Sequence, residues 1–119
     1  MRDIKHSQNP IVVKSDKLAH DVYRATKSYP KEELYGLVSQ MRRAAVSVPV
    51  NIIEGFARKG TKHYRQFLLV SYGSLQELKY FIEFSKDEEL ISEMEFEELY
   101  GLAEECAKML YTTIERMDH

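Results

Sequence analysis

Apolar residues recur every three or four positions through almost the whole chain, which predicts long amphipathic helices. Gly and Pro are scarce and fall mostly between these periodic segments, as in a bundle of helices joined by short turns. No stretch of useful length alternates with period two, which argues against a sheet. The sequence therefore predicts an all-α fold, an antiparallel up-and-down four-helix bundle.

The first two predicted helices are separated by Pro30. The first is expected to begin near Ser15 or Asp16, either of which can cap its first turn, and to end before the proline. The second is expected to begin just after Pro30 and to run to about Arg58.

The third and fourth predicted helices also have start signals. Thr61 is expected to cap the third, and Ser92 with Glu95 three residues later forms a capping box for the fourth. The middle of the third helix holds a cluster of small residues: Ser71, Gly73 and Ser74. We expect this cluster to let a neighbouring helix approach closely.

The second helix has an unusual pattern, because polar residues recur at helical spacing along one side of it. This polar ladder consists of Gln40, Arg43, Ser47, Asn51 and Glu54. An apolar seam lies on each side of the ladder, one with Val38, Met41, Ala45, Val48 and Ile52, the other with Val46, Val50, Ile53 and Ala57. Since buried polar groups need partners, we interpret the ladder as an assembly or bundle network that meets another helix, from this chain or from a copy. A helix with two apolar sides is expected to be buried in more than one direction.

Pro49 lies inside the second helix. An interior proline removes one backbone hydrogen bond, so we expect a second helix that is kinked at Pro49, near Ala45 to Val48. A break of the helix at this point is the alternative.

Composition and charge narrow the possible functions. The 119 residues fit one domain, for which we expect a flexible N-terminal tail over residues 1–13 and a single four-helix-bundle domain over residues 14–119. The formal net charge is −2, but residues 1–82 hold 14 Lys/Arg against 7 Asp/Glu, and residues 83–119 hold 3 against 12. The two parts are therefore oppositely charged. The absence of a signal peptide and of a long apolar run favours a cytoplasmic protein with no membrane partner.

A basic cluster surrounds the turn between the second and third helices, and it contains no acidic residue. It consists of Arg58, Lys59, Lys62, His63 and Arg65. With Arg42 and with Lys79, Gln76 and Tyr72 of the third helix, it is a candidate strip for contacting RNA or DNA phosphates. The alternatives are a solvated loop, or a contact with the acidic fourth helix within one subunit or between subunits.

No motif indicates an enzyme. Phosphate-binding loops, metal-binding His motifs and nucleophile elbows are all missing from the sequence. We therefore expect no cofactor, no metal site and no small-molecule substrate. His20 and His63 are interpreted as surface or interface residues. Cys106, the single cysteine, cannot form an intramolecular disulfide and is interpreted as a small buried apolar residue.

These residues resemble a family of four-helix-bundle proteins, the 23S rRNA intervening-sequence proteins, also called S23 ribosomal proteins. Three elements carry the resemblance, which spans roughly residues 14–117. They are Tyr29-Pro30 with Glu33; Gln40, Arg43, Ala44, Ala45, Ser47, Asn51, Glu54 and Gly55; and Gly73, Ser74, Glu77 and Leu78.

The resemblance implies an antiparallel four-helix bundle that assembles into a homo-oligomer. In relatives, including the accessory variability determinant of diversity-generating retroelements, the assembly is a pentamer with a basic surface that engages nucleic acid. The negative net charge of this chain departs from that pattern. We thus expect a non-enzymatic, oligomeric bundle. The hypothesis for its function is binding of RNA or DNA through the basic turn, and the alternative is a protein assembly module without nucleic acid.

Overall fold

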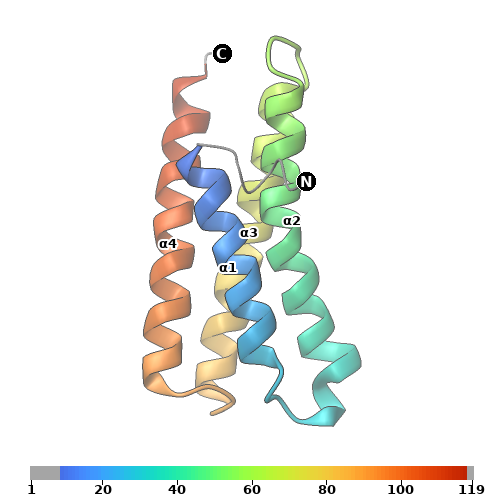
Figure 1. Cartoon of the computed structure of the whole chain (residues 1–119), viewed down its shortest axis with the longest axis vertical. Coiled ribbons are helices and arrows are strands. Elements are labelled where there is room, and N and C mark those ends of the chain that lie inside the picture. The colour runs from blue at the N-terminus through green and yellow to red at the C-terminus, as the bar shows by residue number, and fades with distance from the viewer. Residues whose placement is uncertain (1–8, 118–119) are drawn as a thin grey trace.

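Four long helices make up the computed structural model, which describes residues 9–117. They are α1 (Pro10–Thr26), α2 (Ser39–Ala57), α3 (Tyr64–Asp87) and α4 (Glu93–Arg116). Two short elements, η1 (Lys31–Glu33) and η2 (Leu34–Val38), precede α2. Figure 1 shows the helices side by side, with the chain running up and down between the two ends of the bundle. The predicted all-α four-helix architecture is confirmed.

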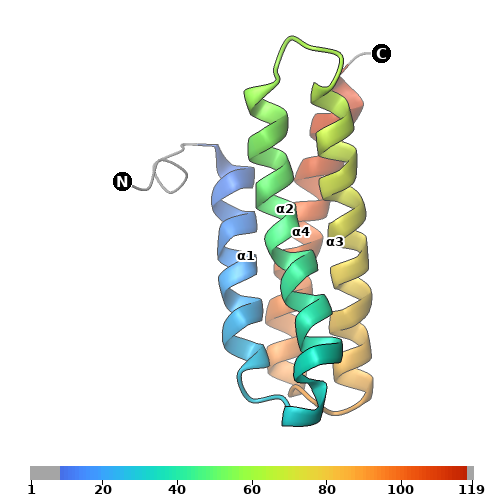
Figure 2. The same ribbon diagram turned by 90° about the vertical axis from the view of Figure 1, so that its right-hand side faces the viewer.

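Each helix packs against two neighbours, α1 and α3 both lying between α2 and α4 (Figures 1 and 2). The core runs along the bundle axis and contains fully buried residues from every helix. The largest of them are Leu18, Val22, Met41, Val48, Ile52, Leu68, Leu75, Leu78, Ile82 and Leu110. The periodic seams of the sequence therefore point inward, as expected for amphipathic helices.

The start of α1 differs from the prediction. Residues 10–13, assigned to the flexible tail of residues 1–13, are helical, and residues 1–8 lie outside the described part. The side chain of Asn9 accepts a hydrogen bond of 3.0 Å from the Ile11 N–H, and Pro10 occupies the first helical position. Asn followed by Pro is a strong start signal, and burial of Ile11 and Val12 in the core anchors the extra turn. The domain therefore begins before residue 14.

The helix predicted after Pro30 begins irregularly. Its first turns form the 3₁₀ segment η1 and the π-helical segment η2, and regular α-helix starts only at Ser39. The helix then continues through Pro49, which excludes the predicted alternative of a break. The two carbonyls just before the proline each receive an extra donor: Asn51 Nδ2 donates to Ser47 O at 2.9 Å, and Ser71 Oγ donates to Val48 O at 2.8 Å. The carbonyl that loses its N–H donor to the proline is that of Ala45, four residues before Pro49, so these two bonds add to the backbone beside that point. The kink itself stays a prediction.

The turns around α3 partly match the predictions. Thr61 does not cap the helix, because its hydroxyl donates to Arg58 O at 2.7 Å and accepts from the His63 N–H at 3.1 Å, both within the turn. The capping box of Ser92 and Glu95 is present at the start of α4. The close approach expected at the small-residue cluster occurs at its two serines, since Ser71 Oγ donates to Val48 O of α2 at 2.8 Å and the Ser74 and Ser47 hydroxyls lie 2.8 Å apart. Gly73 itself is exposed, with no atom within 4 Å of a Cβ built on it.

A candidate nucleic-acid interface at the basic end

The α2–α3 turn closes one end of the bundle. Gly60 adopts a φ of +88°, which L-residues with a side chain rarely adopt, and the Thr61 hydroxyl stabilises the turn as described above. Residues 55–76 contain no Asp or Glu. The basic side chains at these helix ends and in the turn therefore have no carboxylate among their neighbours in the sequence from residue 55 to residue 76.

The basic residues of this turn differ in their contacts. Arg58 forms an ion pair of 2.9 Å with Glu54 and lies over the Phe67 ring at 5.5 Å. Lys59 lies over the Phe56 ring at 5.5 Å, whereas Lys62 is exposed. Within residues 9–117, no ion pair is formed by Lys59, Lys62 or Arg65.

Arg65 lies half-buried in the first turn of α3. Its Nε is buried and has no hydrogen-bond partner among the described residues. Its charge thus belongs to the basic turn without being neutralised there. We call the group formed by Arg58, Lys59, Lys62 and Arg65 the basic end.

Two other cations of the predicted strip are placed elsewhere. Lys79 lies 14 residues beyond Arg65, about 21 Å along α3 at 1.5 Å per residue. Its ammonium group pairs with Glu104 at 3.3 Å and lies over the Tyr100 ring at 5.4 Å. Arg42 donates to Thr26 Oγ1 at 2.9 Å and stacks on Tyr23. Both make contacts within the subunit, and neither extends the basic end.

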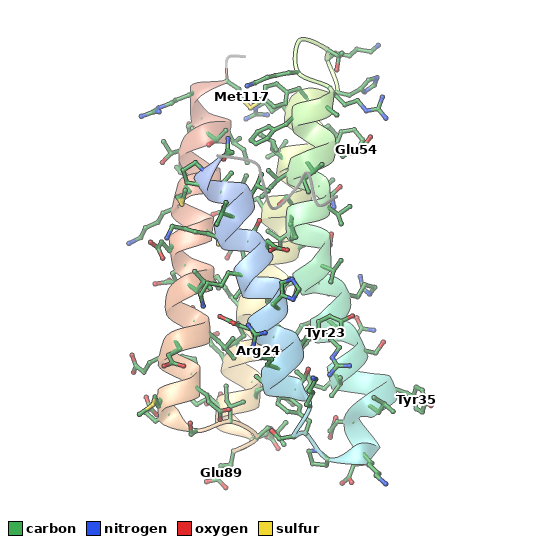
Figure 3. The ribbon with its side chains drawn as sticks, in the orientation of Figure 1. Tyr23, Arg24, Tyr35, Glu54, Glu89 and Met117 are labelled. Carbon is green, nitrogen blue, oxygen red and sulfur yellow. The ribbon has the colours of Figure 1, made fainter. Side chains whose placement is uncertain are left out.

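The two ends of the bundle carry opposite charge. Figure 3 places Glu54, which is one turn before Arg58, and Met117 at one end, and Tyr35 and Glu89 at the other. The far end holds the α3–α4 turn, where residues 86–95 contain five acidic residues and one lysine. Part of the charge separation along the sequence thus becomes a separation between the two ends of the molecule, whose long axis extends over 44 Å.

The polar ladder of α2 faces α3. The Ser47 and Ser74 hydroxyls lie 2.8 Å apart, and Asn51 Nδ2 donates to Ser47 Oγ at 2.9 Å. The Arg43 guanidinium hydrogen-bonds to Gln40 and lies 3.7 Å from Glu77. Ladder residues are exposed or half-buried, so the network lies at the edge of the α2–α3 contact. The sequence motifs already contained Ser74 and Glu77, but only the pairing of α2 with α3 identifies them as partners of the ladder.

The second apolar seam of α2 remains uncovered. Val46 and Val50 are 39% and 53% exposed, which differs from the expectation of a helix buried in more than one direction. They line a groove of ≈ 460 Å³ between α1 and α2 and a shallower one of ≈ 710 Å³ along α2. Both grooves include Tyr23, so they form one continuous surface.

The other reactive side chains have ordinary structural positions. Cys106 is buried, and burial raises the pKa of its thiol to about 11, which confirms its interpretation as a small apolar residue. His20 and His63 are exposed, and His20 Nε2 lies 3.4 Å from Asp16 Oδ1.

Over residues 9–117, no three His, Cys, Asp or Glu side chains gather in a way that could hold a metal ion. None of the described helices is long and apolar enough to cross a membrane.

Comparison with known proteins gives a family. The model of the 23S rRNA-intervening sequence protein family matches residues 7–112. A crystal structure from Bacteroides thetaiotaomicron, described as a protein of unknown function from the S23 ribosomal protein family, superposes with a TM-score of 0.79. The two sequences are 19% identical, and the match covers 88% of this chain and 98% of that chain. No curated protein sequence matches significantly. Because the family model spans most of the sequence, this chain belongs to the 23S rRNA-intervening sequence protein family.

Proposed function

We propose that this protein is a non-enzymatic, homo-oligomeric bundle that binds the phosphate backbone of RNA or DNA through its basic end. One observation carries the proposal: four cations gather at the α2–α3 turn, in a stretch of 22 residues without a carboxylate, and three of them form no ion pair within residues 9–117. Unpaired cations on a protruding turn can displace the counterions of a phosphate backbone. Such contacts do not read sequence.

The rings beside the cations add to this proposal. Phe56 and Phe67 lie under Lys59 and Arg58, and they hold these cations at the surface of the turn. The opposite, acidic end would repel a polyanion, so a bound nucleic acid is expected at one end of the bundle. The negative net charge of the whole molecule does not forbid this arrangement, because surface charges separated by more than about 10 Å are largely screened at 0.1 M salt.

The test is a salt titration of binding to a structured RNA and to a DNA duplex. We expect the logarithm of the association constant to fall linearly with the logarithm of salt concentration, with roughly 0.7 to 0.9 in slope for each phosphate contacted. The variant Lys59→Gln/Lys62→Gln should bind more weakly and lose part of this slope. The control Lys31→Gln/Lys86→Gln removes the same charge near the acidic end and should leave the slope unchanged. An affinity that does not respond to salt, or an equal loss in both variants, would falsify the proposal.

A protein assembly module without nucleic acid is the second candidate, and the exposed Val46 and Val50 favour it. Monomeric proteins rarely expose contiguous apolar patches of large area, so this surface calls for a partner. Light scattering of the purified protein should give a mass several times 14.0 kDa under either candidate. A stable oligomer that binds neither RNA nor DNA would favour the second. For the first candidate, the pentamer implied by the family resemblance is the expected state.

A further inference from the structure

The continuous surface between α1 and α2 has an apolar floor and a cationic rim. Its floor consists of Ala19, Val46, Pro49, Val50 and Ile53. Arg24 and Lys27 of α1 stand on one side, and Arg42 and Arg43 of α2 on the other. Asp16, paired with His20, is the acidic residue among those lining it, toward the first turns of α1. We call this surface the α1–α2 groove.

The outer side of α4 has the complementary character. Met94 is 71% exposed and Gly101 is exposed, with no atom within 4 Å of a Cβ built on it, so a second backbone can come close there. At 100° per residue these two positions lie on one crest, pointing away from the core residues Leu99 and Ala103. Four glutamates flank the crest, Glu97 and Glu104 toward α3, and Glu98 and Glu105 toward α1. Within the subunit, Glu98 lines the hollow between α1 and α4 together with Arg24, whose ion pair is with Asp21 at 2.8 Å. We call this surface the α4 ridge.

The groove and the ridge lie at the same height on the bundle. The ion pair of Lys14 with Glu105, 3.1 Å long, fixes α4 against α1, and the bond of Arg42 with Thr26 fixes α2 against α1. Counting along the antiparallel helices from these contacts places Val46 level with Glu98. The cations of the groove therefore lie at the same distance from the acidic end of the bundle as Glu97 and Glu98 of the ridge.

We propose that the α1–α2 groove of one subunit receives the α4 ridge of a second copy, with both copies the same way up. This inference rests on the homo-oligomer of the proposed function and names its interface. With parallel copies, the α1 side of the ridge, with Glu98, faces Arg24 and Lys27. Its α3 side, with Glu97, faces Arg42 and Arg43. Met94 and Gly101 then cover the exposed valines.

The proposed contact joins two different surfaces, so each copy keeps a free groove and a free ridge for the next copy. Such a contact continues until a ring closes or a filament forms. Because all copies point the same way, their basic ends gather on one face of the assembly. An antiparallel pair would instead set each basic end beside an acidic end.

The experiment uses two charge-reversed variants of the full chain and light scattering after gel filtration. The groove variant is Arg24→Glu/Lys27→Glu, and the ridge variant is Glu97→Lys/Glu98→Lys. All four residues are exposed, so we expect each variant to keep its helix content, which circular dichroism measures. We expect the wild type to run at several times 14.0 kDa and each variant to shift toward the subunit mass.

Mixing the two variants gives the decisive result. In a 1:1 mixture, the acidic groove of the groove variant can bind the basic ridge of the ridge variant. The wild-type groove of the ridge variant can bind the wild-type ridge of the groove variant, so the measured mass should rise again. A single chain with all four substitutions should also assemble. A ridge variant that keeps the wild-type mass would overturn the proposal, since a groove-to-groove dimer does not need α4. A mixture that stays at the subunit mass would overturn it as well.

A pair of variants at apolar positions tests the floor of the groove. Val50→Asp should lower the mass, whereas Val70→Asp, at a residue of α3 that is 45% exposed, should not. Equal effects of the two would contradict the assignment. A monomeric wild type would refute the proposed interface. Binding of RNA by the basic end is tested separately, by the salt titration of the Lys59→Gln/Lys62→Gln variant.

Discussion

At the scale of single residues, two glycines of the family motifs have opposite surroundings. Gly55 is buried where α2 crosses α3, and a Cβ built on it would lie 2.9 Å from Leu68 Cδ2 and 3.3 Å from Phe67 Cβ. Gly73 is exposed in the interior of α3 and has open space around it. The sequence places both in helices but does not distinguish them. Only the packing of α2 on α3 shows that Gly55 is required for close approach and Gly73 is not.

Alanine substitutions at these glycines should therefore change stability in opposite directions. Gly55→Ala overpacks a contact with the fully buried Leu68, so we expect the free energy of unfolding to fall by about 1 to 3 kcal/mol. Gly73→Ala relieves the entropy cost of a glycine in a helix interior and should raise it by about 0.5 to 1 kcal/mol. Urea unfolding at one fixed protein concentration measures both. A loss of stability in Gly73→Ala would mean that a partner subunit covers this position.

At the scale of elements, the periodic seams predict all four helices, and the errors concentrate at their ends. The first seam of the second helix, from Val38 to Ile52, is buried as predicted, and the Ser92 capping box is correct. The sequence predicts a start of α1 that is too late, because Ser15 resembles a helix cap. In the structure Ser15 is buried, and its hydroxyl bonds to Val12 O. The sequence does not indicate that η2 is π-helical, since its side chains follow the pattern of an ordinary α-helix.

The cap of α1 can be tested by substitution of Asn9. Asn9→Ala removes the side-chain acceptor of the Ile11 N–H and should cost about 1 kcal/mol of stability. Asn9→Asp keeps an acceptor at the positive end of the helix dipole and should be close to neutral. Thermal unfolding of both variants beside the wild type measures the difference. If alanine were as stable as aspartate, the first turn of α1 would not depend on this cap.

At the scale of the whole molecule, the arrangement of charge matters more than its sum. The sequence shows a basic part and an acidic part, but it cannot tell whether they meet within one subunit. The structure brings them together at isolated points, such as Lys79 with Glu104 and Lys14 with Glu105, and leaves the basic end apart from the acidic end. The sequence likewise predicted the apolar seam of Val46 and Val50 without showing that it faces outward. Whether the basic and acidic parts meet, and which way this seam faces, both depend on the order of the helices around the bundle.

The proposed interface and the proposed polyanion binding make a joint prediction. If parallel copies gather their basic ends on one face, several weak phosphate contacts act together on one RNA, and affinity rises well beyond that of one subunit. Val50→Asp leaves the basic end intact but should lower RNA affinity by at least tenfold and reduce the salt slope, because fewer phosphates are contacted per complex. Tyr80→Asp, at a residue of α3 that is 59% exposed and about 22 Å along the helix from Arg65, should match the wild type in both. Fluorescence anisotropy of a labelled structured RNA, with protein mass measured in the same buffers, gives the comparison. A Val50→Asp protein that is monomeric and still binds RNA with wild-type affinity and slope would show that each subunit binds alone.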